Sequence, residues 1–176
     1  MAADYSTRIR SLHRRLGIPA DYAAERHLPL HREAKRLVSV GPAADDGKPV
    51  RLAPAVARAW RRMQTAAARD RIELLPLSGF RSVARQVTII RRKRAAGQTL
   101  NEILRLVAAP GHSEHHSGRA LDLGTSGHVS LDSDFGRTAA FHWLRKHAPQ
   151  FGFRLSYPRK NRHRIGYEPW HWCWQN

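Results

Sequence analysis

The sequence predicts one globular domain of the α+β class. The chain has 176 residues, of which 41% are apolar. This is long enough for one domain with a sizeable core and too short for two. Helical patterns come first along the chain and strand-like patterns come later, which is typical of α+β proteins. No internal repeat indicates a repeat array.

The first elements are predicted to be helices. Ile9, Leu12 and Leu16 recur at helical spacing, and Gly17 ends the pattern. Residues 20–38 show a second, less regular helical pattern. We therefore expect a short amphipathic helix followed by another helix.

A longer helix is expected after a turn. Residues 40–49, VGPAADDGKP, are rich in turn formers and predict a connection. Pro54 then begins a helix, because proline suits the first helical turn. The apolar face of this helix carries Val56, Trp60, Met63 and Ala67.

The middle of the chain predicts a strand followed by two helices. Residues 72–77, IELLPL, suit a strand, and a helix is expected from about Ser82. Thr99 and Glu102 have the spacing of a capping box ahead of an apolar run, which marks the start of the next helix. The proline and glycine at 110–111 end that helix.

The last part of the chain predicts mainly strands. Residues 119–123 alternate in the manner of a strand, and a helix is expected near 134–147. Two further strand-like segments, 152–157 and 163–172, are separated by a turn that contains proline and asparagine.

The charge is strongly positive. The chain has 31 Lys and Arg residues against 14 Asp and Glu residues, a formal net charge of +17. Such a field attracts polyanions, among them nucleic acid, anionic cell-wall polymer and acidic membrane surfaces. The basic residues are spread along the chain, so a general surface composition explains them equally well. The densest cluster, RRKR at 91–94, is expected at a solvated helix end.

Cysteine use and hydropathy limit the possible sites and compartments. A lone cysteine, Cys173, excludes an intramolecular disulfide and a multi-cysteine zinc cluster, so a metal site would depend on His, Asp and Glu. Neither a secretory signal nor a membrane span is visible in the sequence. We expect a cytoplasmic protein, or one released by lysis or by a route without a signal peptide.

Residues 111–124, GHSEHHSGRALDLG, can supply metal ligands. A strand over 119–123 places Ala120 and Asp122 on one face, and Gly118 permits a tight turn that brings a preceding histidine alongside. A hydrolytic zinc site has three protein ligands, a position for water and a nearby carboxylate. The same pattern also suits an ordinary histidine-rich turn at the surface or in the core.

The carboxyl-terminal stretch 164–172, RIGYEPWHW, offers a further pair. Glu168 and His171 are three residues apart, and Pro169 argues against a helix interior. Residues three apart on a regular strand point to opposite faces, so a bulge or kink is needed for both side chains to reach one metal. Alternatively, this segment only packs the core through Trp170, Trp172 and Trp174.

Taken together, these segments resemble the VanY-type D-alanyl-D-alanine carboxypeptidases, zinc peptidases of the group that includes lysostaphin and the sonic hedgehog amino-terminal domain. The family pattern SxHxxGxAxD is present as Ser113, His115, Gly118, Ala120 and Asp122. The closing ExxH is present as Glu168 and His171 within GYEPWH. SGFRSVARQ at 78–86 resembles the family segment SGYRSxxxQ, with Phe80 in place of the usual tyrosine. FGF at 151–153 and SYP at 156–158 also match.

The resemblance implies a fold and a site. The fold is a small antiparallel sheet with packed helices, carrying one zinc ion. His115, Asp122 and His171 are implied as the zinc ligands. Glu168 is implied as the general base for a zinc-bound water, and Arg81 as a positive charge for the oxyanion or the substrate carboxylate.

Other residues receive smaller implied roles. Ser113 and Gln86 would form hydrogen bonds near the substrate, and Trp170 would either wall the site or lie in the core. His112 and His116 would be bystanders or substrate-side groups. Cys173 could share a face with His171 in an extended strand, but the family pattern has no cysteine there and a buried free thiol is the ordinary alternative.

The implied activity is hydrolysis of the terminal D-alanine amide of peptidoglycan stem peptides or their precursors. An L,D-carboxypeptidase, a D-Ala-D-Ala dipeptidase and a phage-type endopeptidase would use the same zinc site. The alternative class is a non-catalytic basic module for wall polymer or nucleic acid. No specific nucleic-acid recognition is expected, whereas the basic surface suits an anionic wall polymer.

Within the single domain, residues 51–176 are predicted to form the zinc peptidase core. Residues 1–50 are predicted to form an amino-terminal helical segment to which the sequence assigns no role.

Overall fold

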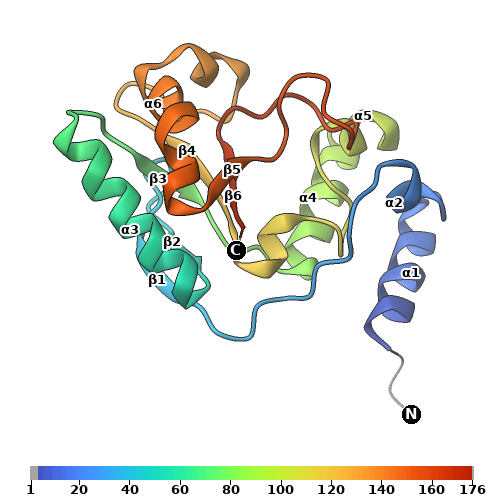
Figure 1. Ribbon diagram of the computed structural model, residues 1–176. Coiled ribbons are helices and arrows are strands. Elements are labelled where there is room, and N and C mark those ends of the chain that lie inside the picture. The colour runs from blue at the N-terminus through green and yellow to red at the C-terminus, as the bar shows by residue number, and fades with distance from the viewer. Residues whose placement is uncertain (1–3, 176) are drawn as a thin grey trace.

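The computed structural model describes residues 4–175 and has the predicted α+β architecture; residues 1–3 and 176, which the predicted domain includes, lie outside the described part. At its centre lies a four-stranded antiparallel sheet with the strand order β3-β4-β6-β5 (Figure 1). The strands are β3 (Leu75–Ser78), β4 (Ala120–Gly124), β5 (Phe153–Leu155) and β6 (His171–Trp174).

The main core lies between this sheet and two helices, α3 (Pro54–Arg69) and α6 (Ala139–His147). The inward-facing strand residues include Leu121, Leu123 and Trp172. The predicted helix face is confirmed, because Val56, Trp60, Met63 and Ala67 are all buried in this core. Since strand residues alternate, Asp122 lies on the opposite face of β4 from Leu121 and Leu123.

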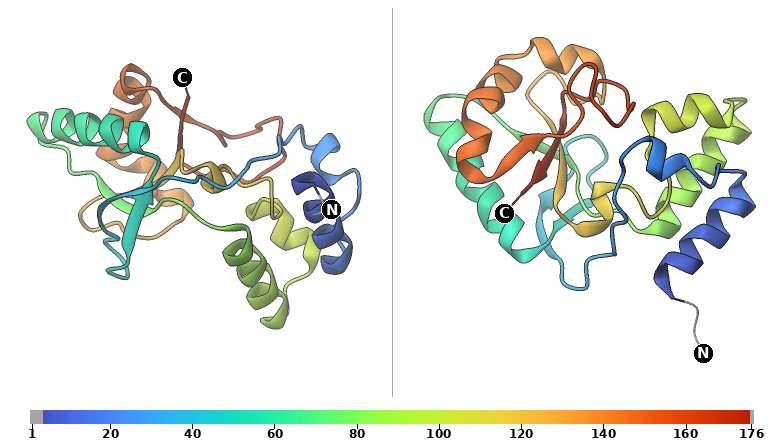
Figure 2. Two further views of the ribbon diagram at one scale, coloured as in Figure 1. Left: turned by 90° about the horizontal axis from the view of Figure 1, so that it is seen from below. Right: turned by 45° about the vertical axis from the view of Figure 1, so that its right-hand side comes forward.

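A second apolar cluster joins the helices on the other side of the molecule (Figure 2). It contains α1 (Tyr5–Leu16), α2 (Tyr22–Glu25), α4 (Val83–Ala95) and α5 (Leu100–Leu106). The predicted helix starts are confirmed, since Ser82 caps α4 and Thr99 forms a capping box with Glu102 at α5. Among the described residues, no helix has the length and apolar character needed to cross a membrane.

The predicted helix over 20–38 forms only at α2, and the rest of that prediction is wrong. After the short α2, the chain runs extended into a hairpin of β1 (Val38–Pro42) and β2 (Pro49–Leu52), so the predicted connection at 40–49 includes parts of both strands. The backbone of this extended segment bonds to the loop before β4 instead of to itself. His31 N donates to Gly111 O at 2.8 Å, and Ala34 N donates to His116 O at 2.8 Å. These long-range hydrogen bonds outweigh local helical preference.

The predicted strand over 163–172 is also mostly wrong, because β6 begins only at His171. The preceding residues use their backbone groups in turns and contacts with other segments. Gly166 N donates to Arg105 O at 2.7 Å, and Glu168 N donates to Tyr157 O at 3.1 Å. The expected strand at 152–157 is shortened to β5. The expected helix at 134–147 is divided into a 3-10 turn, Ser133–Arg137, and α6.

Candidate metal centre

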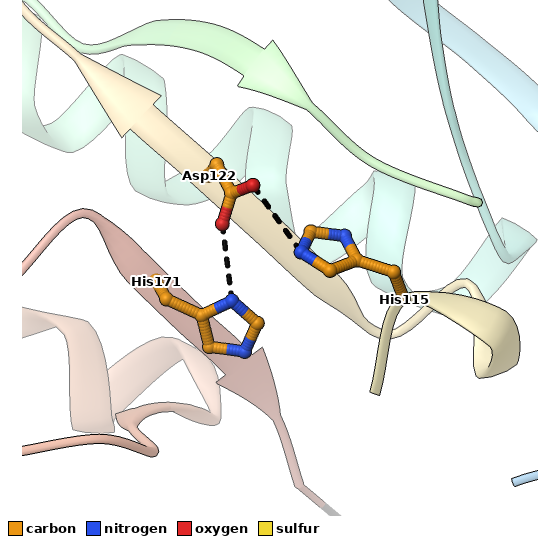
Figure 3. A group of neighbouring side chains, drawn as sticks. All are labelled: His115, Asp122 and His171. Atoms are coloured by element: carbon orange, nitrogen blue, oxygen red, sulfur yellow. Dashed lines mark hydrogen bonds and ion pairs between the residues drawn. The ribbon is translucent and has the colours of Figure 1, made fainter. Parts of the chain in front are cut away.

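Strand pairing brings three candidate ligands together. β4 and β6 are neighbours in the sheet, with Asp122 directly opposite His171. His115 comes from the 3-10 turn Glu114–Ser117, just before β4. One ligand atom from each of these side chains lies within 4.8 Å of the other two, and all three residues are buried (Figure 3). Asp122 is central, since its two oxygens face His171 Nδ1 at 3.0 Å and His115 Nε2 at 3.2 Å.

A glycine shapes the turn that presents His115. Gly118 has a φ of 66°, which confirms the tight turn expected from the sequence. A Cβ at this position would lie 3.0 Å from Ala53 N, so any side chain would press on the neighbouring backbone. The orientation of the His115 ring is fixed by a hydrogen bond, because its Nδ1 donates to Gly79 O at 2.6 Å. This bond leaves the Nε2 lone pair of His115 directed at the centre of the group.

His171 lies between two carboxylates. Its Nδ1 is 3.0 Å from Asp122 Oδ1, and its Nε2 is 2.8 Å from Glu114 Oε2. Burial alone would lower the pKa of His171, but the hydrogen bonds to these carboxylates raise its pKa to about 10. Burial would likewise raise the pKa of Glu114, and the contact with His171 lowers it to about 2. No sequence pattern pointed to Glu114, because no spacing signal links two residues 57 positions apart.

A turn before β6 brings the Glu168 side chain close to His171. This turn takes the place of the bulge or kink that the sequence predicts. His171 N donates to Glu168 O at 3.1 Å immediately before β6 begins. Glu168 Oε2 then lies 3.8 Å from His171 Nδ1. Burial raises the pKa of Glu168 to about 8, with the nearby Asp122 carboxylate also contributing. A carboxyl group with this pKa can both take up and release a proton near neutral pH.

A cavity of about 380 Å³ opens onto these side chains. It lies between the sheet and the α4–α5 pair, and all the candidate site residues from the sequence line it: Arg81, Gln86, Ser113, His115, Asp122, Glu168, Trp170 and His171. Its remaining wall is mainly apolar and includes Ile89, Leu106, Leu131 and Ile165. The residues that the sequence predicts on the substrate side therefore all line one cavity.

Arg81 is held at the edge of the metal centre. Its guanidinium nitrogens lie 3.6 Å from Asp122 Oδ2, 3.2 Å from Ser78 Oγ and 3.4 Å from Gln86 Oε1. Gln86 is almost completely buried and donates to Ala108 O at 2.7 Å. Gln86 thus contacts Arg81 directly, and Arg81 presents a fixed positive charge in the cavity.

His112, His116 and Cys173 lie outside the group of candidate ligands. His112 Nδ1 donates to Pro29 O at 2.9 Å. His116 Nδ1 donates to Arg81 O at 2.6 Å, and burial lowers its pKa to about 4. Neither histidine lines the cavity, so both fit the bystander role. Cys173 is a buried free thiol outside the ligand group, and burial raises its pKa.

The fold and these side chains define an α+β protein with a candidate mononuclear metal site at the base of a cavity. The chain belongs to the VanY family of D-alanyl-D-alanine carboxypeptidases, whose family model matches residues 49–176. The resemblance seen in the sequence is thereby confirmed.

Individual relatives agree with this assignment. The "Putative carboxypeptidase YodJ" of Bacillus subtilis (strain 168) is 37% identical over 125 residues, which are 65% of this chain and 43% of that protein. The solved structure of the LdcB LD-carboxypeptidase is 30% identical with a TM-score of 0.72, covering 83% of this chain and 71% of that one. VanYB in complex with D-alanine-D-alanine is 25% identical with a TM-score of 0.63, covering 84% and 81%. This chain therefore spans less than half the length of the B. subtilis relative.

Proposed function

We propose that this protein is a zinc-dependent D-alanyl-D-alanine carboxypeptidase that hydrolyses the terminal D-alanine amide of peptidoglycan stem peptides or their precursors. The observation that carries the proposal is the convergence of His115, Asp122, His171, Glu168 and Arg81 on one cavity. Family membership and the VanYB complex with D-alanine-D-alanine support the choice of substrate.

The residues present fit a zinc ion. Two imidazoles and one carboxylate are typical ligands for catalytic zinc. In each histidine one ring nitrogen is hydrogen-bonded away from the ligand group, His115 Nδ1 to Gly79 O and His171 Nε2 to Glu114. The other ring nitrogen of each is then the one that binds the metal, as in other histidine–zinc sites. With His115, Asp122 and His171 as its ligands, bound zinc would supply a water of lowered pKa and polarise the scissile carbonyl.

The protein's own groups perform the proton transfer and hold the substrate. Glu168 accepts a proton from the attacking water and passes it to the leaving amine, since its carboxyl group lies beside the ligands and has a pKa near neutrality. Arg81 binds the substrate's terminal carboxylate or the developing oxyanion. Gln86 and Ser113 provide hydrogen bonds beside it, and Trp170 forms part of the wall.

The test is mass spectrometry of the products formed from a stem pentapeptide, with and without a zinc chelator. A D,D-carboxypeptidase releases one D-alanine from the pentapeptide, and the chelator abolishes this release. The second candidate is an L,D-carboxypeptidase, favoured by the likeness to LdcB. That activity would instead act on a stem tetrapeptide. An intact pentapeptide would contradict the D,D-carboxypeptidase proposal, and intact peptides in both reactions would contradict both candidates.

We also propose that the protein acts at the bacterial wall or on its precursors, where its basic surface contacts an anionic wall polymer. A groove of about 790 Å³ lies between α1 and α4. Its lining includes four arginines, Arg8, Arg14, Arg15 and Arg91, and one carboxylate, Glu33. Binding to purified walls should fall with added salt, and with replacement of the groove arginines by alanine. Equal binding to walls stripped of polymer, or preference for DNA, would contradict this contact.

A further inference from the structure

Glu114 contacts the candidate metal centre from the side opposite the site cavity. Its Oε2 lies 2.8 Å from His171 Nε2, and its side chain is 18% exposed. It does not line the site cavity. Instead it faces a second cavity of about 330 Å³, whose walls include His31, Arg119 and Cys173. Glu114 therefore contacts His171 on the side of the imidazole ring that faces away from the substrate.

The two candidate histidine ligands present opposite nitrogens to the metal centre. His115 donates from Nδ1 to Gly79 O at 2.6 Å, so its Nε2 is the ligand atom. His171 directs Nε2 to Glu114, which lies outside the ligand group, so its Nδ1, which is 3.0 Å from Asp122, is the ligand atom. A neutral imidazole carries one proton, and the nitrogen that carries it cannot bind a metal.

We propose that Glu114 is a positioning residue that holds His171 in the Nε2–H tautomer and orients Nδ1 toward the cation. A carboxylate in this position fixes the ring and makes the ligand nitrogen more basic. Because Glu114 immediately precedes His115, a single 3-10 turn supplies one ligand and orients the other. The inference rests on the proposed zinc site, but it assigns Glu114 a role in metal affinity and none in substrate contact.

The variants Glu114→Ala and Glu114→Gln test this role through zinc affinity, measured by competition with a chromophoric chelator. Glu114→Ala removes the acceptor, and the expected loss of zinc affinity is about 10- to 100-fold. Glu114→Gln keeps an oxygen that accepts from Nε2–H, so it should recover most of that affinity. Glu25→Ala removes an exposed glutamate from α2 and is the control for charge alone. It should bind zinc like the unaltered protein.

A second measurement needs no variant. In the zinc-loaded protein, long-range nitrogen–proton NMR spectra should show the His171 proton on Nε2 and the metal on Nδ1. A proton on Nδ1, or an Ala variant that binds zinc as tightly as the unaltered protein, would overturn the role of Glu114 while leaving the zinc site intact. Failure of the unaltered protein to bind zinc would overturn both the inference and the proposed function.

Discussion

The substitution Glu168→Gln separates proton transfer from metal binding. The amide has nearly the same size as the carboxyl group, so it leaves no cavity, but it cannot accept a proton from water. Loss of a general base lowers the catalysed rate by about 100- to 10,000-fold. The proposed metal ligands His115, Asp122 and His171 are unchanged, so zinc should remain bound.

The same substitution should stabilise the zinc-free protein at neutral pH. Burial raises the pKa of Glu168 from 4.5 to about 8 in the folded chain. Between these values the unfolded chain has released the proton while the folded chain keeps it, so the stability of the folded state falls as pH rises. At about 1.4 kcal/mol per pH unit, the cost accumulated from pH 4.5 to pH 7 is about 3 kcal/mol. Glutamine carries no such cost.

The assay combines stopped-time hydrolysis of the pentapeptide with urea unfolding of the zinc-free protein at pH 4 and pH 7. The variant should show a large loss of kcat, retained zinc, and a gain of up to about 3 kcal/mol at pH 7 that disappears near pH 4. Glu25→Gln, at an exposed position, is the matched control and should change neither quantity. Normal turnover by Glu168→Gln would refute its assignment as the base, and a gain equal at both pH values would refute the burial argument.

Three other perturbations test separate parts of the site. Arg81→Ala should lower kcat/KM on a peptide ending in D-alanine by about 10- to 100-fold, the value of a charged hydrogen bond; unchanged kcat/KM would exclude the anion contact. Gly111→Ala should lower the free energy of unfolding by about 1–3 kcal/mol, since the new Cβ would lie 2.7 Å from Ile9 Cγ2 at a φ of 88°; an unchanged Tm would show that α1 does not constrain this loop. Zinc affinity should rise by about tenfold per pH unit between pH 6 and 9, because the pKa of His171 is about 10 and zinc must displace its proton; calorimetry showing no pH dependence would contradict this.

The elements that the sequence predicts well are those with local signals. Pro54 at a helix start, the Thr99–Glu102 capping box and the alternation over 119–123 each reflect interactions within a few residues, and the structure confirms them. The alternation also predicts Asp122 on the same face as Ala120, and in the structure Asp122 meets His115 and His171 there.

The errors arise where distant segments decide the backbone conformation. Residues 20–38 contain helix-forming side chains, but His31 and Ala34 give their N–H groups to the loop before β4. The contact between Glu114 and His171 crosses 57 positions and depends on the turn before β6, which no local pattern specifies. The predicted division of the domain at residue 51 stays a prediction, and residues 1–50 still have no assigned role.

The most direct test of the metal centre is X-ray absorption spectroscopy at the zinc edge on the zinc-loaded protein. We predict one zinc per chain, surrounded by nitrogen and oxygen atoms at about 2.0–2.1 Å. The spectrum should also show outer-shell scattering from two imidazoles, which is lost when His115 and His171 are replaced by alanine. A sulfur neighbour at about 2.3 Å, which Cys173 would have to supply, or a spectrum unaffected by the loss of both histidines, would contradict it.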